Sequence, residues 1–182
     1  MAAISRWCDL PDPGGAIPAI ATIFFAASNT QSFASAAAKL QFRERWLGRY
    51  LAFDAGLVFV AHDAYGNLSG YLVGSFDDPA LTARFGDIGY FAELAQLTAR
   101  YPAHLHVNLD AKARGSGTGS ELVGAFVRAA GSAGLPGVHV VTGRGARNVR
   151  FYERLGFVER MMFVHNGYEL VFLGRDLTPA QP

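Results

Sequence analysis

The residues best suited to chemistry stand at positions 114–120, which read Arg-Gly-Ser-Gly-Thr-Gly-Ser. Three glycines at alternate positions allow positive φ and let backbone amides approach a ligand closely. This turn precedes a segment with helical periodicity, and the first amides of a helix lack internal partners and carry a partial positive charge. Such a turn suits an anionic phosphate, so we expect a phosphate-binding loop here.

The glycine spacing excludes the common nucleotide motifs. A mononucleotide P-loop requires a lysine after its last glycine, and no lysine follows Gly119. A dinucleotide fingerprint starting at Gly115 meets Ser120 where its last glycine is required. One starting at Gly117 meets Leu122 at that position. The Gly-x-Ser-x-Gly turn of a nucleophilic serine is also absent. A purely structural turn remains the alternative.

Regular elements are predicted on both sides of this loop. Residues 103–110 alternate between apolar and polar side chains, which is typical of a half-buried strand. After the loop, apolar residues recur at steps of three and four, which predicts an amphipathic helix. These residues are Leu122, Val123, Phe126, Val127 and Ala130.

A second motif covers residues 148–157. Val149, Tyr152 and Leu155 share one helical face. Gly156 stands where a left-handed residue ends a helix, and Phe157 begins the next strand. The pattern therefore predicts a short helix that ends at a glycine and leads directly into a strand.

In these two motifs the chain resembles the GNAT N-acetyltransferases. Their acyl-CoA pyrophosphate loop is matched by Arg114-x-x-Gly117-x-Gly119, and their helix after the fifth strand by residues 151–157, Phe-Tyr-Glu-Arg-Leu-Gly-Phe. The match is sharp over residues 101–164 and only topological before them. It implies a single α/β domain, residues 1–182, with helices on both faces of a mixed sheet that is splayed between strands 4 and 5.

The resemblance also implies a reaction. Acetyl-CoA is the expected cosubstrate, and a primary amine of a small molecule or peptide would attack its thioester directly. Backbone groups of the fourth strand would bind pantetheine, the loop would bind the pyrophosphate, and Asn148 would replace an asparagine that many relatives carry at the position of Gly145. The expected cofactor-binding residues are Val107, Asn108, Leu109, Arg114, Gly115, Ser116, Gly117, Thr118, Gly119, Ser120 and Asn148.

Two residues are candidates for proton transfer. Tyr152 lies where the family places a phenol near the thioester sulfur, so it is the candidate general acid. Its alternative is a buried tyrosine that packs the helix onto the sheet. His106 is the candidate base because histidine titrates near neutral pH, although such a residue is more often structural. His104 and His106 could instead bind a metal, but no third ligand is evident, so we expect no metal.

An inactive protein is the alternative function. Residues 101–106 also resemble acetyltransferase-like domains attached to some O-GlcNAc hydrolases, several of them catalytically silent. Many of those domains have an acidic residue at the position of Asn108. Its replacement here favours a pseudo-acetyltransferase that binds acyl-CoA as a sensor or interaction module.

Composition limits the remaining possibilities. The chain has 182 residues, 51% of them hydrophobic, and a net charge of only +1, which disfavours a nucleic-acid partner. One cysteine, Cys8, excludes a disulfide framework and fits a cytoplasmic protein. The apolar run 16–27 is too short to span a membrane. Asp9 and Asp12 precede it, so a packed helix is preferred over an export leader.

The other expected elements follow from periodicity and turn residues. Helices are predicted at 16–27, at 31–50 with Ser32 as a cap, and at 88–100. Hairpins are predicted at 57–61 with 68–76, and at 158–165 with 167–175 across Asn166-Gly167. A short strand is expected at 138–142. The apolar final hairpin could pair with a second copy of the chain.

Overall fold

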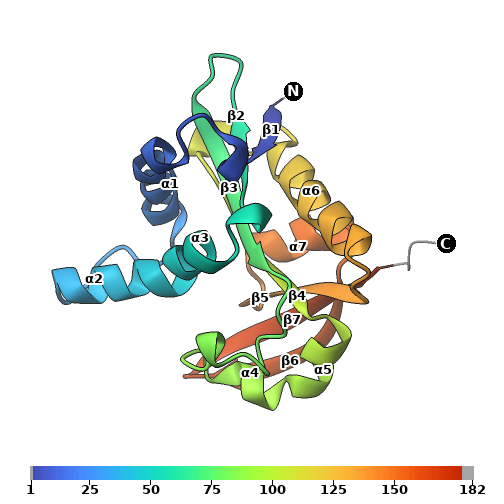
Figure 1. The fold of residues 1–182 in the computed structure, drawn as a ribbon. Helices are drawn as coiled ribbons and strands as arrows, with labels where there is room; N and C mark the ends of the chain where they lie inside the picture. The colour runs from blue at the N-terminus through green and yellow to red at the C-terminus, as the bar shows by residue number, and fades with distance from the viewer. Residues whose placement is uncertain (1, 178–182) are drawn as a thin grey trace. The chain divides into compact units, whose positions relative to one another are not determined.

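The computed structural model describes residues 2–177 and contains the helices and strands shown in Figure 1. The strands are β1 Ala3–Arg6, β2 Phe59–His62, β3 Leu68–Ser75, β4 Ala103–Leu109, β5 Gly137–Gly143, β6 Val158–His165 and β7 Tyr168–Asp176. The α-helices are α1 Pro13–Ala27, α2 Ala36–Arg43, α3 Arg49–Phe53, α4 Tyr90–Glu93, α5 Ala95–Arg100, α6 Thr118–Ser132 and α7 Arg147–Arg154.

These elements fall into two compact units. The first comprises the chain up to Ser75 together with His106–Phe126, and the second comprises Phe76–Leu105 and the chain from Val127 onward. Both β4 and α6 begin in one unit and end in the other. Within the described residues the sheet order is β1-β2-β3-β4-β5-β7-β6.

The first unit contains the antiparallel strands β1, β2 and β3. β1 pairs with β2, and β2 pairs with β3. β3 is buried from Ser69 to Ser75, and α1 and α3 pack against it. The end of β4 continues this unit, where the amide of Asp110 donates to the carbonyl of Ser69 at 2.9 Å. The predicted first hairpin is confirmed. β1 was not predicted, because four residues with mixed exposure carry no readable alternation.

α1 confirms the predicted first helix and begins slightly earlier. The Asp12 carboxylate accepts a hydrogen bond from the amide of Gly15, and Pro13 occupies the first helical turn, where its missing N–H costs nothing. The buried face consists of Ile20, Ile23 and Phe24. This face explains why the apolar run packs as a helix against the sheet.

The predicted helix at 31–50 is wrong at its start and in its continuity. Residues 31–35 are not helical, and the cap is Ser35, whose hydroxyl accepts from the amide of Ala38 at 3.1 Å. A π-helical turn, Glu44–Gly48, separates α2 from α3. Ser32 and Ser35 have the same capping chemistry, so side-chain type alone could not choose between them.

The second unit contains the start of β4 and the last three strands. β4 runs parallel to β5, with Ala103 opposite Val138 and His104 opposite His139. β7 pairs antiparallel with both β5 and β6. The expected α/β fold with a mixed sheet is therefore confirmed. The helix predicted at 88–100 is divided at Leu94 into α4 and α5.

The two most specific sequence patterns form as predicted. Gly156 has φ +83°, and the amide of Phe157 returns to the carbonyl of Tyr152 at 3.1 Å, closing α7 with a left-handed cap. Asn166 and Gly167 have φ of 48° and 80°, the conformation of a type I′ turn between β6 and β7. The apolar face predicted for α6 is buried throughout.

Candidate functional site

The glycine loop before α6 is open. Gly115 and Gly117 have φ of +79° and +90°, a region that side-chain-bearing residues avoid. A Cβ placed on either glycine would meet no atom within 4 Å. The backbone at these positions is therefore uncovered by neighbouring side chains, as access for a ligand requires.

The amides of the loop differ in whether the protein supplies an acceptor. Those of Ser120 and Glu121 bond to the carbonyl of Gly117, at 2.9 and 3.1 Å, and start the helix. Within the described residues, no protein acceptor is assigned to the amides of Gly115, Gly117 and Gly119. These three N–H groups at the start of a fifteen-residue helix are the chemistry that binds an anion.

Side chains of the loop hold its shape. The hydroxyl of Ser116 donates to the carbonyl of Ala113 at 2.7 Å and lies 2.8 Å from the hydroxyl of Thr118. Before it, the carboxylate of Asp110 accepts from the amide of Lys112. Arg114 is exposed at the entrance to the loop, where its charge can act on an anionic ligand.

His106, on β4, is held by residues of the helical segment 44–53. Its Nε2 lies 3.2 Å from the hydroxyl of Tyr50, and its ring packs edge-on against Trp46 at 5.4 Å between centroids. Burial, assisted by the positive charge of Arg49, lowers the pKa of His106 to about 4. The imidazole is therefore neutral at pH 7, with a proton on one ring nitrogen and an electron pair on the other.

Asn108 lies two residues further along β4. Its side-chain amide donates to the hydroxyl of Tyr71, on β3, at 2.9 Å. Burial raises the pKa of Tyr71, so its hydroxyl stays protonated at neutral pH. Leu109 lies over Gly70, where a Cβ would collide with the leucine side chain. The end of β4 is thus fixed from the β3 side.

Tyr152 and Asn148 belong to the second unit. Tyr152 is 5% exposed and packs against Phe157 with 5.5 Å between ring centroids. Burial raises its pKa, so the phenol is protonated at neutral pH. Asn148 is exposed, and its side-chain oxygen accepts from the hydroxyl of Thr142 at 3.0 Å, which leaves its amide nitrogen as a donor.

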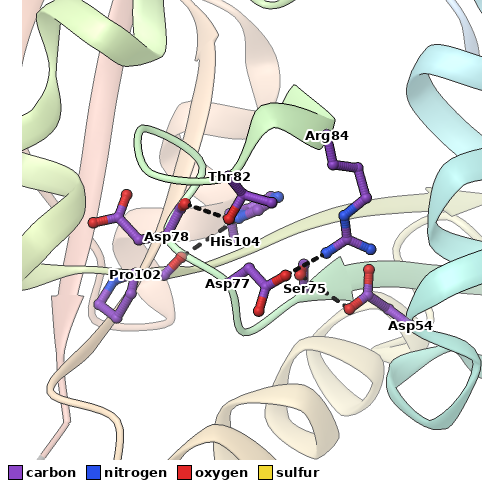
Figure 2. Close-up of polar contacts among 8 residues, drawn as sticks. All are labelled: Asp54, Ser75, Asp77, Asp78, Thr82, Arg84, Pro102 and His104. Carbon is purple, nitrogen blue, oxygen red and sulfur yellow. Dashed lines mark hydrogen bonds and ion pairs between the residues drawn. The ribbon is translucent and has the colours of Figure 1, made fainter. Parts of the chain in front are cut away.

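His104 is a packing residue of the second unit. It is 3% exposed and lies among the rings of Phe85, Phe91 and His139, with 4.7 Å between the His104 and Phe85 centroids. Figure 2 shows its ring beside Pro102, whose carbonyl oxygen is 3.4 Å from Nδ1. Among residues 2–177, no cluster of three or more potential ligand side chains is placed to hold a metal ion.

Sequence reasoning did not identify the tyrosines that contact the β4 side chains. Tyr50 lies 56 positions before His106, and Tyr71 lies 37 positions before Asn108. Periodicity places Tyr50 on a helical face but does not name its partner.

Within the described residues, no helix is long and apolar enough to cross a bilayer.

Comparison with solved structures shows which proteins share this fold. SsHAT is 23% identical with a TM-score of 0.69, covering 96% of this chain and 98% of its own. A phosphinothricin acetyltransferase from Sinorhizobium meliloti, crystallised with AcCoA, is 18% identical with a TM-score of 0.62, covering 97% and 88%. The ribosomal-protein-S18-alanine N-acetyltransferase from Escherichia coli is 15% identical with a TM-score of 0.61, covering 100% and 97%.

The family assignment comes from the sequence. Residues 24–157 match the model of the acetyltransferase (GNAT) family. The match spans more than half of the chain and includes the glycine loop, β4 and α7. The chain therefore belongs to the GNAT acetyltransferase family.

Proposed function

We propose that this protein transfers the acetyl group of acetyl-CoA to a primary amine of a small molecule or peptide. The observation that carries this proposal is the open loop at 114–120, whose glycine amides have no assigned protein acceptor in the described chain. Crystallised acetyltransferases of the same fold support it, since the Sinorhizobium enzyme was solved with AcCoA.

Cofactor binding is assigned to backbone groups. The loop 115–120 receives the pyrophosphate through the amides of Gly115, Gly117 and Gly119, Arg114 adds a charge, and the side-chain nitrogen of Asn148 adds a donor. Val107, Asn108 and Leu109 supply backbone partners for the pantetheine amides. The parallel ladder between β4 and β5 consists of two residue pairs at the start of both strands, which supports this role for the end of β4.

The reaction requires two proton transfers. The amine nitrogen bonds to the acetyl carbon, the carbon–sulfur bond breaks, and the sulfur leaves with the electron pair. Bonding to the carbonyl carbon makes the nitrogen more acidic than a free ammonium, and neutral His106 is assigned as the base that takes its proton. Tyr152 is assigned as the acid that donates a proton to the departing sulfur, because its phenol remains protonated at neutral pH.

Positioning is expected to supply much of the rate. Holding an amine against a thioester converts a bimolecular encounter into a reaction within one complex. The sequence has no nucleophilic elbow, and no acyl-enzyme is required. The acceptor would be chosen by α1, α2 and the helical segment that follows them, where the family lines its acceptor cleft.

A silent acyl-CoA-binding module is the second candidate. Asn108 favours it, because many acetyltransferase-like domains attached to O-GlcNAc hydrolases have an acidic residue there and because its amide is already bonded to Tyr71. This candidate keeps the loop and the cosubstrate but has no turnover. The resemblance of residues 101–106 to domains attached to O-GlcNAc hydrolases also favours this candidate.

The final hairpin supports a homodimer as part of the proposal. Its large exposed apolar side chains are Val158, Met161, Met162, Val164 and Tyr168. β6 is at one end of the strand order. A second copy would cover these side chains and pair the open strand edge.

Two assays distinguish the two functions. Acetyl-CoA at 100 times its Kd should stabilise the protein by about 2.7 kcal/mol, which a thermal unfolding assay detects. Thiol release across a panel of small amines and N-terminal peptides then measures turnover, and Tyr152→Phe should remove most of it while leaving acetyl-CoA binding intact. Stabilisation without turnover would support the silent module. No stabilisation would overturn both.

A further inference from the structure

The contact between Tyr50 and His106 determines which histidine nitrogen is available. Tyr50 is completely buried, and its hydroxyl lies 3.2 Å from Nε2 of His106. The two rings meet edge-on at 70°, with centroids 5.5 Å apart. Trp46 supports the same imidazole at 82°. Both aromatic rings come from the segment that includes the π-helical turn and α3.

A neutral imidazole carries one N–H and one electron pair, so the direction of this hydrogen bond has chemical consequences. If the Tyr50 hydroxyl donated to Nε2, the ring proton would be on Nδ1 and no basic nitrogen would remain. If Nε2–H donates to the tyrosine oxygen, Nδ1 keeps the electron pair. Only the second arrangement allows His106 to accept a proton elsewhere.

The neighbouring pair on β4 has a defined hydrogen-bond direction. Two residues along the strand, the amide nitrogen of Asn108 donates to the hydroxyl oxygen of Tyr71 at 2.9 Å. An amide nitrogen can only donate, so the tyrosine oxygen is the acceptor there. His106 and Asn108 share one side of β4, because side chains alternate along a strand. On this face a tyrosine oxygen already accepts from a β4 side chain.

We propose that Tyr50 is a positioning residue which accepts the Nε2–H of His106 and thereby leaves Nδ1 to take the proton from the acceptor amine. This inference rests on the proposed acetyltransferase function. In the step, an N–H bond of the amine breaks, an Nδ1–H bond forms, and the ring becomes an imidazolium. The bond from Nε2–H to Tyr50 strengthens as that charge appears.

The charged side chain that acts on the ring is Arg49, which precedes Tyr50 on α3. Its charge and the burial of the ring both disfavour the imidazolium. As a hydrogen-bond acceptor, the tyrosine oxygen stabilises the imidazolium and so opposes both effects without adding a charge. Removing it should therefore make His106 a weaker base.

Ring nitrogen NMR on the full chain tests the tautomer directly. At pH 7 the ¹⁵N shifts of His106, assigned with His106→Gln, should show a protonated Nε2 and an unprotonated Nδ1. Tyr50→Phe should remove this preference. The matched control is Tyr71→Phe, which deletes the neighbouring hydroxyl and should leave the His106 tautomer unchanged. A protonated Nδ1 in the wild type would overturn the inference, whatever the turnover.

Kinetics test the consequence. Tyr50→Phe should lower kcat at least 10-fold, leave the KM for acetyl-CoA unchanged, and move the acidic limb of the pH profile to lower pH. Unchanged kcat and an unchanged profile would overturn the inference. A wild-type chain that shows protonated Nε2 but turns over no amine would instead overturn the proposed function, because the tautomer is measured without substrate.

Discussion

Two pairs of glycines in this chain use the missing side chain for opposite purposes. In the loop before α6, Gly115 and Gly117 have positive φ and empty space around the position of a Cβ. Gly137 on β5 and Gly174 on β7 instead face the ring of Tyr101, which a Cβ would strike. The first pair exposes backbone for a ligand, whereas the second pair makes room for an aromatic ring.

Tyr101 explains why the second region needs its glycines. The ring is fully buried and lies 6.0 Å from Phe172. The guanidinium groups of Arg100 and Arg160 lie over it at 5.3 and 5.4 Å, and both arginines pair with Asp176. Glycine content alone therefore does not mark a ligand site. The backbone conformation and the space around the absent Cβ distinguish the two uses.

The largest expected effect is on stability in the Tyr101 region. In Gly137→Ala the new Cβ would lie 2.8 Å from the carbonyl oxygen of Arg100 and would also strike the Tyr101 ring, so backbone must move. We expect a loss of about 3 kcal/mol in the free energy of unfolding, measured by urea denaturation. Gly131→Ala on α6 is the control, because its Cβ meets nothing within 4 Å. Equal stability of the two variants would contradict the role of Gly137 in making room for the Tyr101 ring.

The next effect is on ligand binding by the loop. Gly117→Val should weaken acetyl-CoA binding at least 30-fold by titration calorimetry, or about 2 kcal/mol, because a side chain at φ +90° strains the amides and covers them. Gly66→Val is the matched control, since Gly66 has φ +81° and equally open surroundings. It should lose similar stability but retain binding. Weakened binding in the control would show that strain alone is responsible.

Acid should destabilise the surroundings of His106 and the Tyr101 region in different pH ranges. The pKa of His106 is about 4 in the native state and about 6.5 when unfolded, so only the unfolded chain binds the proton between these values. Stability is full above pH 6.5 and should fall by on the order of 3 kcal/mol as pH drops to 4. The hydrogen bond from Arg100 lowers the pKa of Asp176. The stability that the ionised Asp176 carboxylate contributes is therefore lost only below about pH 4.

Urea unfolding at a series of pH values measures both ranges. His106→Gln should flatten the slope between pH 6.5 and 4, and Asp176→Asn should change it only below that range. If Asp176→Asn flattened the upper range, the assignment to His106 would be wrong.

The smallest expected effect comes from one cation over the Tyr101 ring. Arg160→Gln should cost about 0.5 kcal/mol, because the arginine lies over the ring and pairs with a half-exposed carboxylate. Arg144→Gln removes an exposed pair with Glu169 for which no ring contact is assigned among residues 2–177, and it should cost less. Urea denaturation at low and high salt separates the two contributions, since only the ion pair is screened. A larger loss in Arg144→Gln would contradict the role of the ring.

Much of the fold was predictable because its signals are local. The period of residues 103–110 predicted β4, the left-handed cap at Gly156 was predicted from one helical face, and Asn166-Gly167 predicted the last turn. The start of α2 and the break at Leu94 were not predictable in this way. Ser32 and Ser35 compete as caps, and Leu94 is a good helix former, so its residue type does not indicate the break between α4 and α5.

For the candidate site, the sequence by itself determined the order of a strand, a glycine turn and a helix, and with it the family. It could not distinguish Gly117 from Gly137, because both are simply glycine until the surrounding atoms are known. Only the tertiary structure showed that Tyr50 meets His106 and Tyr71 meets Asn108. The physical reason is that backbone preferences depend on neighbours in sequence, whereas hydrogen bonds, burial and pKa depend on residues that folding brings together.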